Sequence, residues 1–314
     1  MRNRLFTIFG GTGFIGRYVV CRLANRGGRI RVISRSPRTH GHHLQPLGRV
    51  DQIVVDSADL NSEDSLRRAV GGAAGVVNLI GILHETGRQK FAEVQGALPG
   101  RIAAAAAAGG ARLVQISAIG ADAASASAYA RSKAEGERRV REAFPDATIL
   151  RPSIVIGPED GFFNRFASLA RMLPALPLIG GGRTRFQPVY VGDVAQAVVA
   201  VLERDDCRGQ TYELGGPQTY TFAELMRYML KVVGRRRLLP TVPFGVAMAQ
   251  ARLLELLPDP PLTRDQVELL KVDNVASLDL PGLQALDITP TPIELIVPQY
   301  LSRYRAGPAR VTRL

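Results

Sequence analysis

The chain has 314 residues, of which 46% are hydrophobic, enough to bury the core of one large α/β domain with a smaller lobe. Its net charge of +12 comes mainly from arginine, but no basic stretch is interleaved with aromatic residues, so we expect no nucleic-acid partner. Two cysteines exclude a disulfide framework, and neither an apolar run of about 18 residues nor an N-terminal targeting segment is present, which predicts a cytoplasmic protein.

Short apolar runs alternate with helical patterns over the first 150 residues. This alternation is typical of a doubly wound parallel sheet, the Rossmann-type α/β fold. The predicted strands cover residues 5–9, 30–33, 52–55, 76–80, 112–116 and 148–150. The predicted helices begin near Ile15 and then cover residues 62–70, 91–108 and 129–143.

The pattern changes after residue 150. Glycine and proline become frequent, and the remaining elements are shorter, with a helix over 192–202 and a strand over 210–214. We therefore expect a nucleotide-binding domain over residues 1–150. Residues 151–314 are expected to form a smaller mixed C-terminal lobe that partly returns to the main sheet.

The sequence GGTGFIG, residues 10–16, lies between the first predicted strand and the first helix. Glycines at this spacing let the chain turn sharply, let a pyrophosphate approach the backbone, and let the helix pack closely on the strand. The helix N-terminus then offers N–H groups and a positive dipole end to the phosphates. The expected contacts with a dinucleotide are Gly10, Thr12, Gly13, Phe14, Ile15 and Gly16.

The end of the second strand selects the nucleotide. For NAD, an acidic residue is expected about 20 residues after the glycines, where it would bind the ribose hydroxyls. Counting from Gly16 leads to Arg35, between Ser34 and Arg38, and no carboxylate lies between Phe6 and Asp51. An arginine fork suits a 2′-phosphate, so we predict NADPH rather than NADH. The alternative is a solvated surface arginine, which fits Arg38 better than Arg35.

Two further loops complete the expected dinucleotide site. In this fold the loops after the third and fourth strands flank the adenine and the ribose-pyrophosphate. The corresponding residues here are Asp59, Leu60, Asn78, Leu79, Ile80 and Gly81.

Tyr129 and Lys133 are four residues apart, and hence on one face of a predicted helix. An ammonium group stabilises a phenolate, so the tyrosine could give and take a proton near neutral pH. The alternative is that Tyr129 is a half-buried helix residue and that Lys133 only binds the nicotinamide ribose.

The glycine loop, Ser117 at the end of the fifth strand and the Tyr-x-x-x-Lys pair together resemble the short-chain dehydrogenase/reductase superfamily, of the atypical or extended kind. The resemblance implies hydride transfer between NAD(P) and a carbonyl or alcohol. In that scheme Ser117 orients the substrate oxygen, Tyr129 exchanges its proton and Lys133 holds the ribose.

The serine departs from the family pattern. Extended enzymes usually end this strand with two serines, the later being catalytic, whereas here Ser117 is followed by Ala118. If Ser117 matches the first serine, Ala118 fills the catalytic place; if the loop is aligned on Gly120, Ser117 is the catalytic serine. The interval of 12 from Ser117 to Tyr129 is near that of simpler members. This leaves turnover open, but not binding.

The second half narrows the resemblance. The segments VREAFPD (140–146), LRPS (150–153), FFNRFAS (162–168), QPVYVGDV (187–194), LTRDQVE (262–268) and LPGL (280–283) occur in order. They resemble the NAD(P)H-binding accessory subunits of respiratory complex I (subunit 9 of the alpha subcomplex) and their bacterial relatives, over nearly the whole chain up to Arg305. The missing transit peptide favours a bacterial source, and Pro152 completes the expected cofactor contacts.

The resemblance implies a non-catalytic accessory or assembly protein that holds NADPH on the peripheral arm of complex I near the quinone module, or on a related quinone-linked complex. The alternative is an NADPH-dependent reductase, epimerase or dehydratase that uses Tyr129 and Lys133. A redox-state regulator without turnover is a third hypothesis.

A peripheral contact with the cytoplasmic face of the inner membrane would suit residues 242–257, an apolar segment that follows the Arg235–Arg237 cluster. A core helix of the small lobe is the alternative. The loop with His40, His42 and His43 lacks nearby cysteine or acidic ligands, so no metal is expected. Glu135 and Glu137 are expected to be solvated helix positions.

Overall fold

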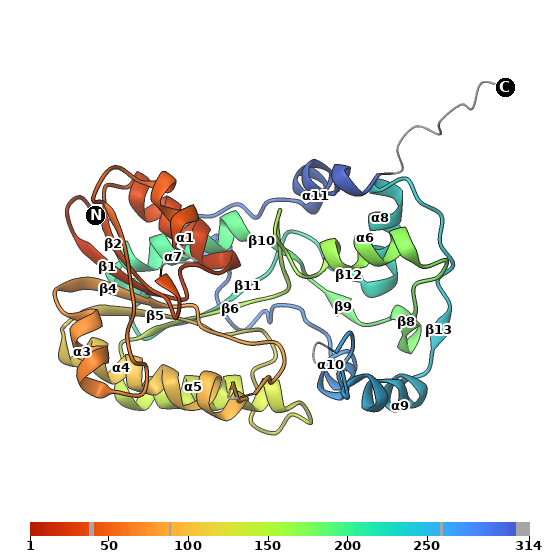
Figure 1. Ribbon diagram of the computed structural model, residues 1–314, viewed down its shortest axis with the longest axis horizontal. Helices are drawn as coiled ribbons and strands as arrows, with labels where there is room; N and C mark the ends of the chain where they lie inside the picture. Colours follow the sequence, from red (N-terminus) through yellow and green to blue (C-terminus); the bar gives the residue numbers. More distant parts are fainter. Residues whose placement is uncertain (38–40, 88, 258–259, 306–314) are drawn as a thin grey trace. The chain divides into compact units, whose positions relative to one another are not determined.

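The computed structural model describes residues 1–37, 41–87, 89–257 and 260–305, which form two compact units (Figure 1). The first unit consists of Met1–Pro152, Val191–Leu214 and Ala276–Thr289. The second consists of Ser153–Tyr190, Gly215–Val275 and the described residues from Pro290 onward. Residues 151–314 therefore do not all lie in one unit, because residues 151–152, 191–214 and 276–289 belong to the first.

The first unit is built on a seven-stranded sheet in the order β11-β6-β5-β4-β1-β2-β3, with every neighbouring pair parallel. Its strands are β1 (Leu5–Phe9), β2 (Arg29–Ile33), β3 (Ile53–Asp56), β4 (Ala73–Asn78), β5 (Arg112–Ile116), β6 (Thr148–Pro152) and β11 (Thr211–Leu214). The strand order reverses between β1 and β4, which is where ligands bind in sheets of this type. The predicted doubly wound fold is confirmed.

Helices cover both faces of this sheet (Figure 1). One face carries α1 (Phe14–Asn25) and α7 (Val191–Glu203), which pack against each other. The other carries α3 (Glu63–Val70), α4 (Leu98–Ala108) and α5 (Ala128–Ala143), of which α4 contacts both α3 and α5. Because both faces are covered, the strands read as continuous apolar runs, which is why their positions could be predicted closely.

The helix expected over residues 91–108 is present, but its first part, Ala92–Ala97, is π-helical and leads directly into α4. A β-carbon at Gly136 would lie 2.1 Å from the Gln95 carbonyl oxygen, so this turn lies directly on the α5 backbone. The Gln95 amide also donates to Ser132 Oγ at 3.2 Å. Turns of this kind are frequent at functional sites.

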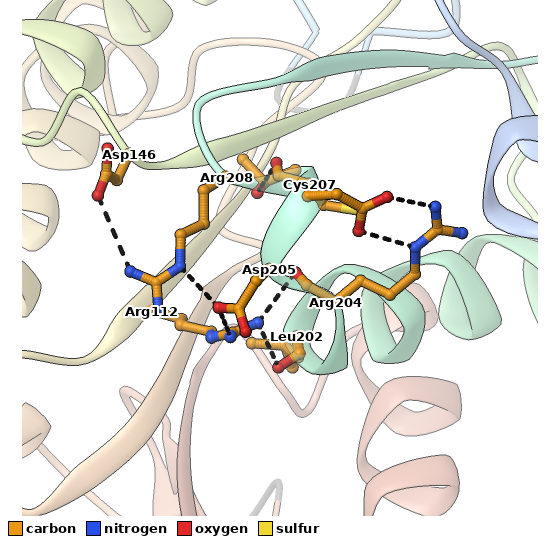
Figure 2. Close-up of polar contacts among 9 residues, drawn as sticks. Arg112, Asp146, Leu202, Arg204, Asp205, Cys207 and Arg208 are labelled. Atoms are coloured by element: carbon orange, nitrogen blue, oxygen red, sulfur yellow. Dashed lines mark hydrogen bonds and ion pairs between the residues drawn. The ribbon is translucent and has the colours of Figure 1, made fainter.

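Ion pairs and hydrogen bonds join the C-terminal end of α7 and the turn after it to the start of strand β5, as Figure 2 shows. Arg112, at the start of β5, donates to the carbonyl oxygens of Leu202 (3.1 Å) and Arg204 (3.0 Å), at the C-terminal end of α7. Arg112 also pairs with Asp205, which accepts from Arg208 Nε at 3.1 Å. A cation is favourable at a helix C-terminus, so Arg112 joins β5 to a helix that lies far along the chain.

The second unit is a smaller mixed α/β lobe. Its elements are β7 (Val155–Ile156), α6 (Phe163–Met172), β8 (Leu178–Ile179), β9 (Arg185–Phe186), β10 (Val189–Tyr190), β12 (Tyr220–Thr221), α8 (Phe222–Val232), β13 (Thr241–Val242), α9 (Phe244–Leu254), α10 (Arg264–Leu269) and α11 (Ile293–Leu301). The short strands pair two by two. Phe162, Phe166 and Phe222 pack edge to face in its core.

One buried carboxylate organises this lobe. Asp160 accepts hydrogen bonds from the backbone N–H groups of Gly157 (3.2 Å), Phe162 (3.0 Å) and Asn164 (3.2 Å), and from the hydroxyl of Tyr300 on α11. Burial nevertheless raises the pKa of Asp160 above its ordinary value, against the effect of these hydrogen bonds. The carboxylate therefore ties the start of α6 to α11.

Among the described residues, no helix has the length and apolar character needed to cross a membrane.

Candidate cofactor-binding site

The glycine loop is folded tightly between β1 and α1. Gly10 has a left-handed backbone (φ +77°), and its carbonyl oxygen accepts from Gly13 N at 3.0 Å. A β-carbon at Gly16 would lie 2.5 Å from that same oxygen, and one at Gly11 would lie 2.8 Å from Val32 Cγ1. These glycines are therefore required for the first turn of α1 to approach β1.

The N-terminus of α1 has the properties of an anion site. Gly13 occupies the cap position, and within the described part of the chain no side chain caps this end. No acidic residue lies in the first turn. The first-turn N–H groups and the positive dipole end therefore fit a pyrophosphate. Thr12, Phe14 and Ile15 are half-buried around this end.

The second strand ends in one buried and one exposed residue. Ser34 is buried; its N–H donates to the Asp56 carbonyl oxygen (2.9 Å) and its Oγ accepts from Ser36 N (3.3 Å). Arg35 is exposed. Ser34 thus shapes the turn, and Arg35 carries the charge at this end of β2. Arg38, the other predicted arginine, lies outside the described residues.

The loop after β3 is held by its own contacts. Asp59 N donates to Ser65 Oγ at 3.0 Å, and Asp59 Oδ1 accepts from Asn61 N at 2.9 Å. Leu60 is half-buried against the core beneath α3. Both residues lie at the carboxyl edge of the sheet, where the adenine was expected, but the Asp59 carboxylate serves the turn before α3.

The loop after β4 lies directly against the glycine loop. A β-carbon at Gly10 would be 3.1 Å from the Leu79 carbonyl carbon, and Leu79 N donates to Phe9 O at 2.9 Å. Asn78 is fully buried; its Oδ1 accepts from Ile80 N (3.1 Å) and its amide donates to Gln115 Oε1 (2.8 Å). Asn78 therefore fixes this loop and is not itself exposed to a ligand.

Lys133 reaches the same place from α5. Its side chain is buried, with Nζ 5.8 Å from the centre of the Tyr129 ring. A β-carbon at the exposed Gly81 would be 3.4 Å from both Lys133 Nζ and Gln95 Oε1. Burial lowers the pKa of Lys133 to about 8, while the negative charge of Glu137 raises it. The structure thus brings together the loop after β4, Tyr129 and Lys133.

Ser117 stands at the end of β5 with its side chain buried. Its N–H donates to Leu150 O at 2.8 Å, but its Oγ has no hydrogen-bond partner among the residues that the structure describes. Gln95 Oε1 is likewise buried without such a partner in the described ranges. A buried polar atom in this state is costly unless a ligand or water completes it. Pro152 is buried, and its carbonyl oxygen is taken by Ile119 N at 3.1 Å.

Two features of the site were missed or misjudged from the sequence. Gln95 was not selected, although a glutamine in an otherwise apolar helix start is a usable signal. The expectation that Glu137 is solvated was wrong: Glu137 is buried and paired with Arg151. Its position four residues after Lys133, on the same helix face as Tyr129, was the available signal.

Residues 242–257, for which the sequence allows either a docking surface or a core helix, are partly packed and partly exposed. Helix α9 packs through Ala247 and Ala251 on Ile179 and Val267, and its half-buried Phe244 and Met248 pack against the same cluster. Leu253 is 70% exposed on the same helix, and Val246, Leu256 and Leu257 are also exposed. Each interpretation therefore holds for part of the segment: one side of α9 belongs to a small core, and the other side is exposed.

The preceding arginine cluster is partly structural. Arg235 Nε donates to Tyr304 O at 3.3 Å, and Arg237 Nε donates to Ala170 O at 2.8 Å. Arg236 is exposed. In the ranges that the structure describes, no three His, Cys, Asp or Glu side chains gather as a metal ion would require.

Comparison with known proteins agrees with this geometry. Residues 6–215 match the NAD dependent epimerase/dehydratase family. The chain resembles the solved NADPH-dependent quinone oxidoreductase QOR2 of Escherichia coli, in complex with NADPH, with a TM-score of 0.72, 20% identity and coverage of 95% and 99% of the two chains. At that identity the likeness supports the fold alone.

Curated relatives are more similar in sequence. The chain is 37% identical over 313 residues to NADH dehydrogenase [ubiquinone] 1 alpha subcomplex subunit 9 of Arabidopsis thaliana, covering 96% of this chain and 78% of the relative. The rat protein of the same name is 38% identical, covering 95% and 80%. A ceramide reductase of Caulobacter vibrioides is 32% identical over 244 residues, covering 75% and 73%.

The family match spans the glycine loop, the Tyr-x-x-x-Lys helix and β11. A nicotinamide dinucleotide is the cofactor that this match and the geometry of α1 have in common. The chain therefore belongs to the NAD dependent epimerase/dehydratase family and, within it, to the group of complex I alpha subcomplex subunit 9 proteins.

Proposed function

We propose that this protein is an NADPH-holding accessory or assembly subunit of respiratory complex I, or of a related quinone-linked complex, with little or no turnover of its own. The observation that carries the proposal is the extent of the likeness to subunit 9, which covers 96% of the chain and hence the second unit as well as the nucleotide-binding one. The sequence likeness to the ceramide reductase covers less of the chain, 75%.

The choice of NADPH depends on Arg35. It is the exposed residue at the end of β2, where a carboxylate would bind the ribose hydroxyls of NAD. The neighbouring carboxylate, Asp56 on β3, accepts from Ser57 N at 2.7 Å and so serves its own turn. A guanidinium in this place favours a 2′-phosphate.

The remaining residues would hold the dinucleotide in order. The glycine loop and the N-terminus of α1 would bind the pyrophosphate, the loop from Leu79 to Gly81 would line the ribose, and Lys133 would donate to the nicotinamide ribose hydroxyls. When bound, the dinucleotide supplies a hydride donor or acceptor. The protein's own part in the proposed function is to retain it.

Docking is assigned to the second unit. An apolar surface in and just after α9 consists of the exposed side chains of Leu253, Leu256 and Leu257. The exposed Arg236 adds a positive charge ahead of α9 in the sequence. Such a surface suits a membrane-associated partner or the headgroup region of the cytoplasmic face of the inner membrane.

The test is purification of the tagged protein from its native membranes. Co-purification of complex I subunits in fixed ratio, with NADPH released from the preparation on denaturation, is the expected result. Recovery of the protein free of respiratory subunits, with turnover of an added carbonyl substrate, would contradict it.

The second candidate function is an NADPH-dependent reductase acting on a lipid or related carbonyl. It is favoured by the ceramide reductase relative and by Ser117, whose buried Oγ lacks a partner among the described residues. Reduction of a ceramide-type ketone by the purified protein, lost on Tyr129→Phe, would establish it.

A further inference from the structure

The buried charges on α5 continue beyond Lys133. Glu137 lies one helical turn further on and is buried as Lys133 is. Arg151, on β6, binds both carboxylate oxygens of Glu137, through Nε at 2.8 Å and Nη2 at 2.6 Å. This fork-to-fork geometry fixes the direction of the Glu137 side chain.

The same arginine extends the chain of charges to a second carboxylate. Arg151 Nη1 contacts Glu213 Oε1 on β11 at 3.3 Å. Glu213 is also buried, and its other oxygen accepts from the backbone N–H of Ser277 at 2.8 Å. Two cations and two carboxylates thus balance each other between α5, β6 and β11.

These residues lie close to the places where the chain passes from one unit to the other. The chain passes between the two units at Pro152/Ser153, Leu214/Gly215 and Val275/Ala276, among other places. Arg151, Glu213 and Ser277 each lie next to one of these crossings. The charges that begin beside Lys133 therefore end on three segments that lead into the second unit.

Stability alone does not explain this arrangement. Replacing a buried ion pair by apolar residues of similar volume is often neutral or stabilising. What Glu137 does provide is a carboxylate one helical turn from Lys133, whose negative charge raises the lysine pKa that burial lowers. Near Lys133 also lie the Tyr129 ring, whose centre is 5.8 Å from Nζ, and Gly81, where a β-carbon would be 3.4 Å from both Lys133 Nζ and the neutral Gln95 Oε1.

We propose that Glu137, held by Arg151, is the positioning residue that keeps Lys133 charged and directed at the cofactor. Through Arg151 and Glu213 it also connects the cofactor site to the three crossing segments, so that bound cofactor steadies them. The inference rests on the proposed role of Lys133 in holding the nicotinamide ribose.

The first measurement is the Kd for NADPH between pH 7 and 10, a range that lies above the second pKa of a phosphomonoester, about 6. A charged Lys133 binds and a neutral one does not, so wild-type affinity should fall as the pH rises above about 8. In Glu137→Gln the lysine loses its neighbouring charge, and the fall should begin about one pH unit lower.

Glu142→Gln is the matched control, since Glu142 lies on the same helix but pairs with Arg138 on the exposed side. Its profile should follow that of the wild type. Identical profiles for Glu137→Gln and the wild type would overturn the positioning role. If Glu137→Gln does not fold, Arg151→Lys keeps the charge but loses the bidentate geometry, and it should shift the profile in the same direction.

Hydrogen exchange tests the link to the crossings. NADPH should slow exchange in wild-type peptides over residues 211–216 and 275–280 at least threefold, and this protection should be lost in Glu137→Gln at saturating NADPH. Binding without protection in the wild type would overturn this link while leaving the proposed function intact. Absence of NADPH binding by the wild type would instead overturn the proposed function.

Discussion

Gly16 lies so close to Gly10 that a β-carbon on Gly16 would be 2.5 Å from the Gly10 carbonyl oxygen. Gly16→Ala should therefore push α1 away from β1, at a cost of about 1–3 kcal/mol in the free energy of unfolding. The cofactor should be lost with it, because the first-turn N–H groups move. Thermal unfolding and NADPH titration measure both effects.

Gly245→Ala is the control for this substitution. A β-carbon at Gly245, in α9, would meet nothing within 4 Å in the described ranges, so the change should leave stability unchanged or slightly higher. Equal behaviour of the two variants would show that the closeness of Gly16 to Gly10 has no part in cofactor binding.

The preference for NADPH should depend on Arg35. We expect NADPH to bind at least tenfold more tightly than NADH, about 1.4 kcal/mol, and Arg35→Asp to narrow or invert the ratio. Arg29→Asp changes an exposed arginine at the other end of β2 and should leave the ratio unchanged. Calorimetric titration with NADPH and with NADH measures the two affinities. Equal affinities in the wild-type protein would contradict the assignment of NADPH as the cofactor.

Tyr129 and Lys133 separate a cofactor holder from an enzyme. Lys133→Ala should weaken NADPH retention by about 1–3 kcal/mol, since a charged hydrogen bond is lost. Tyr129→Phe should leave retention and respiration nearly intact in a holder, whereas an enzyme would lose about 10²–10⁴-fold in rate. Complementation of a deletion strain, with respiratory NADH oxidation as readout, distinguishes them; loss of function with full NADPH occupancy would favour the reductase.

The second unit should depend on the Tyr300 hydroxyl. Tyr300→Phe removes a donor to the buried Asp160 carboxylate, and should destabilise by about 1.5–3 kcal/mol. Tyr304→Phe, on the more exposed turn just after α11, serves as the control and should cost far less. Denaturant unfolding measures the difference, and a similar small effect for both would mean that Asp160 does not need this donor.

Docking should depend on the apolar surface at α9. Changing Leu253 and Leu256 to serine should release the protein from membrane fractions while NADPH affinity stays the same, because both lie in the second unit. Leu278→Ser alters an even more exposed leucine of the first unit and should release nothing. Arg236→Glu is the suitable charge change, since Arg235 and Arg237 hold backbone carbonyl groups.

Local patterns predicted most of the sheet. Strands β1 and β5 begin and end at the predicted residues, because strands covered on both faces are mainly apolar. The π-helical turn before α4 could not be predicted in this way, since it follows from the close approach of Gly136 to Gln95 across two helices.

In the candidate site, too, the residues with a local sequence pattern could be predicted and those with distant partners could not. The glycine loop and the pair Tyr129 and Lys133 are recognisable because their spacing is local. Glu137 is not, since its partner Arg151 comes from β6 and the next carboxylate, Glu213, from β11. A buried charge has the same local sequence pattern as a solvated one until its distant partner is known.

The return of Val191–Leu214 and Ala276–Thr289 to the first unit has a consequence for synthesis on the ribosome. When Pro152 emerges, the sheet still lacks β11, and Arg112 still lacks the end of α7 to which it binds. At about 5–20 residues per second, the nascent sheet waits on the order of ten seconds for its last segment. During that time β6 is an unpaired edge strand that can pair with other chains. A chaperone or an early-bound nucleotide would therefore limit aggregation most during this interval.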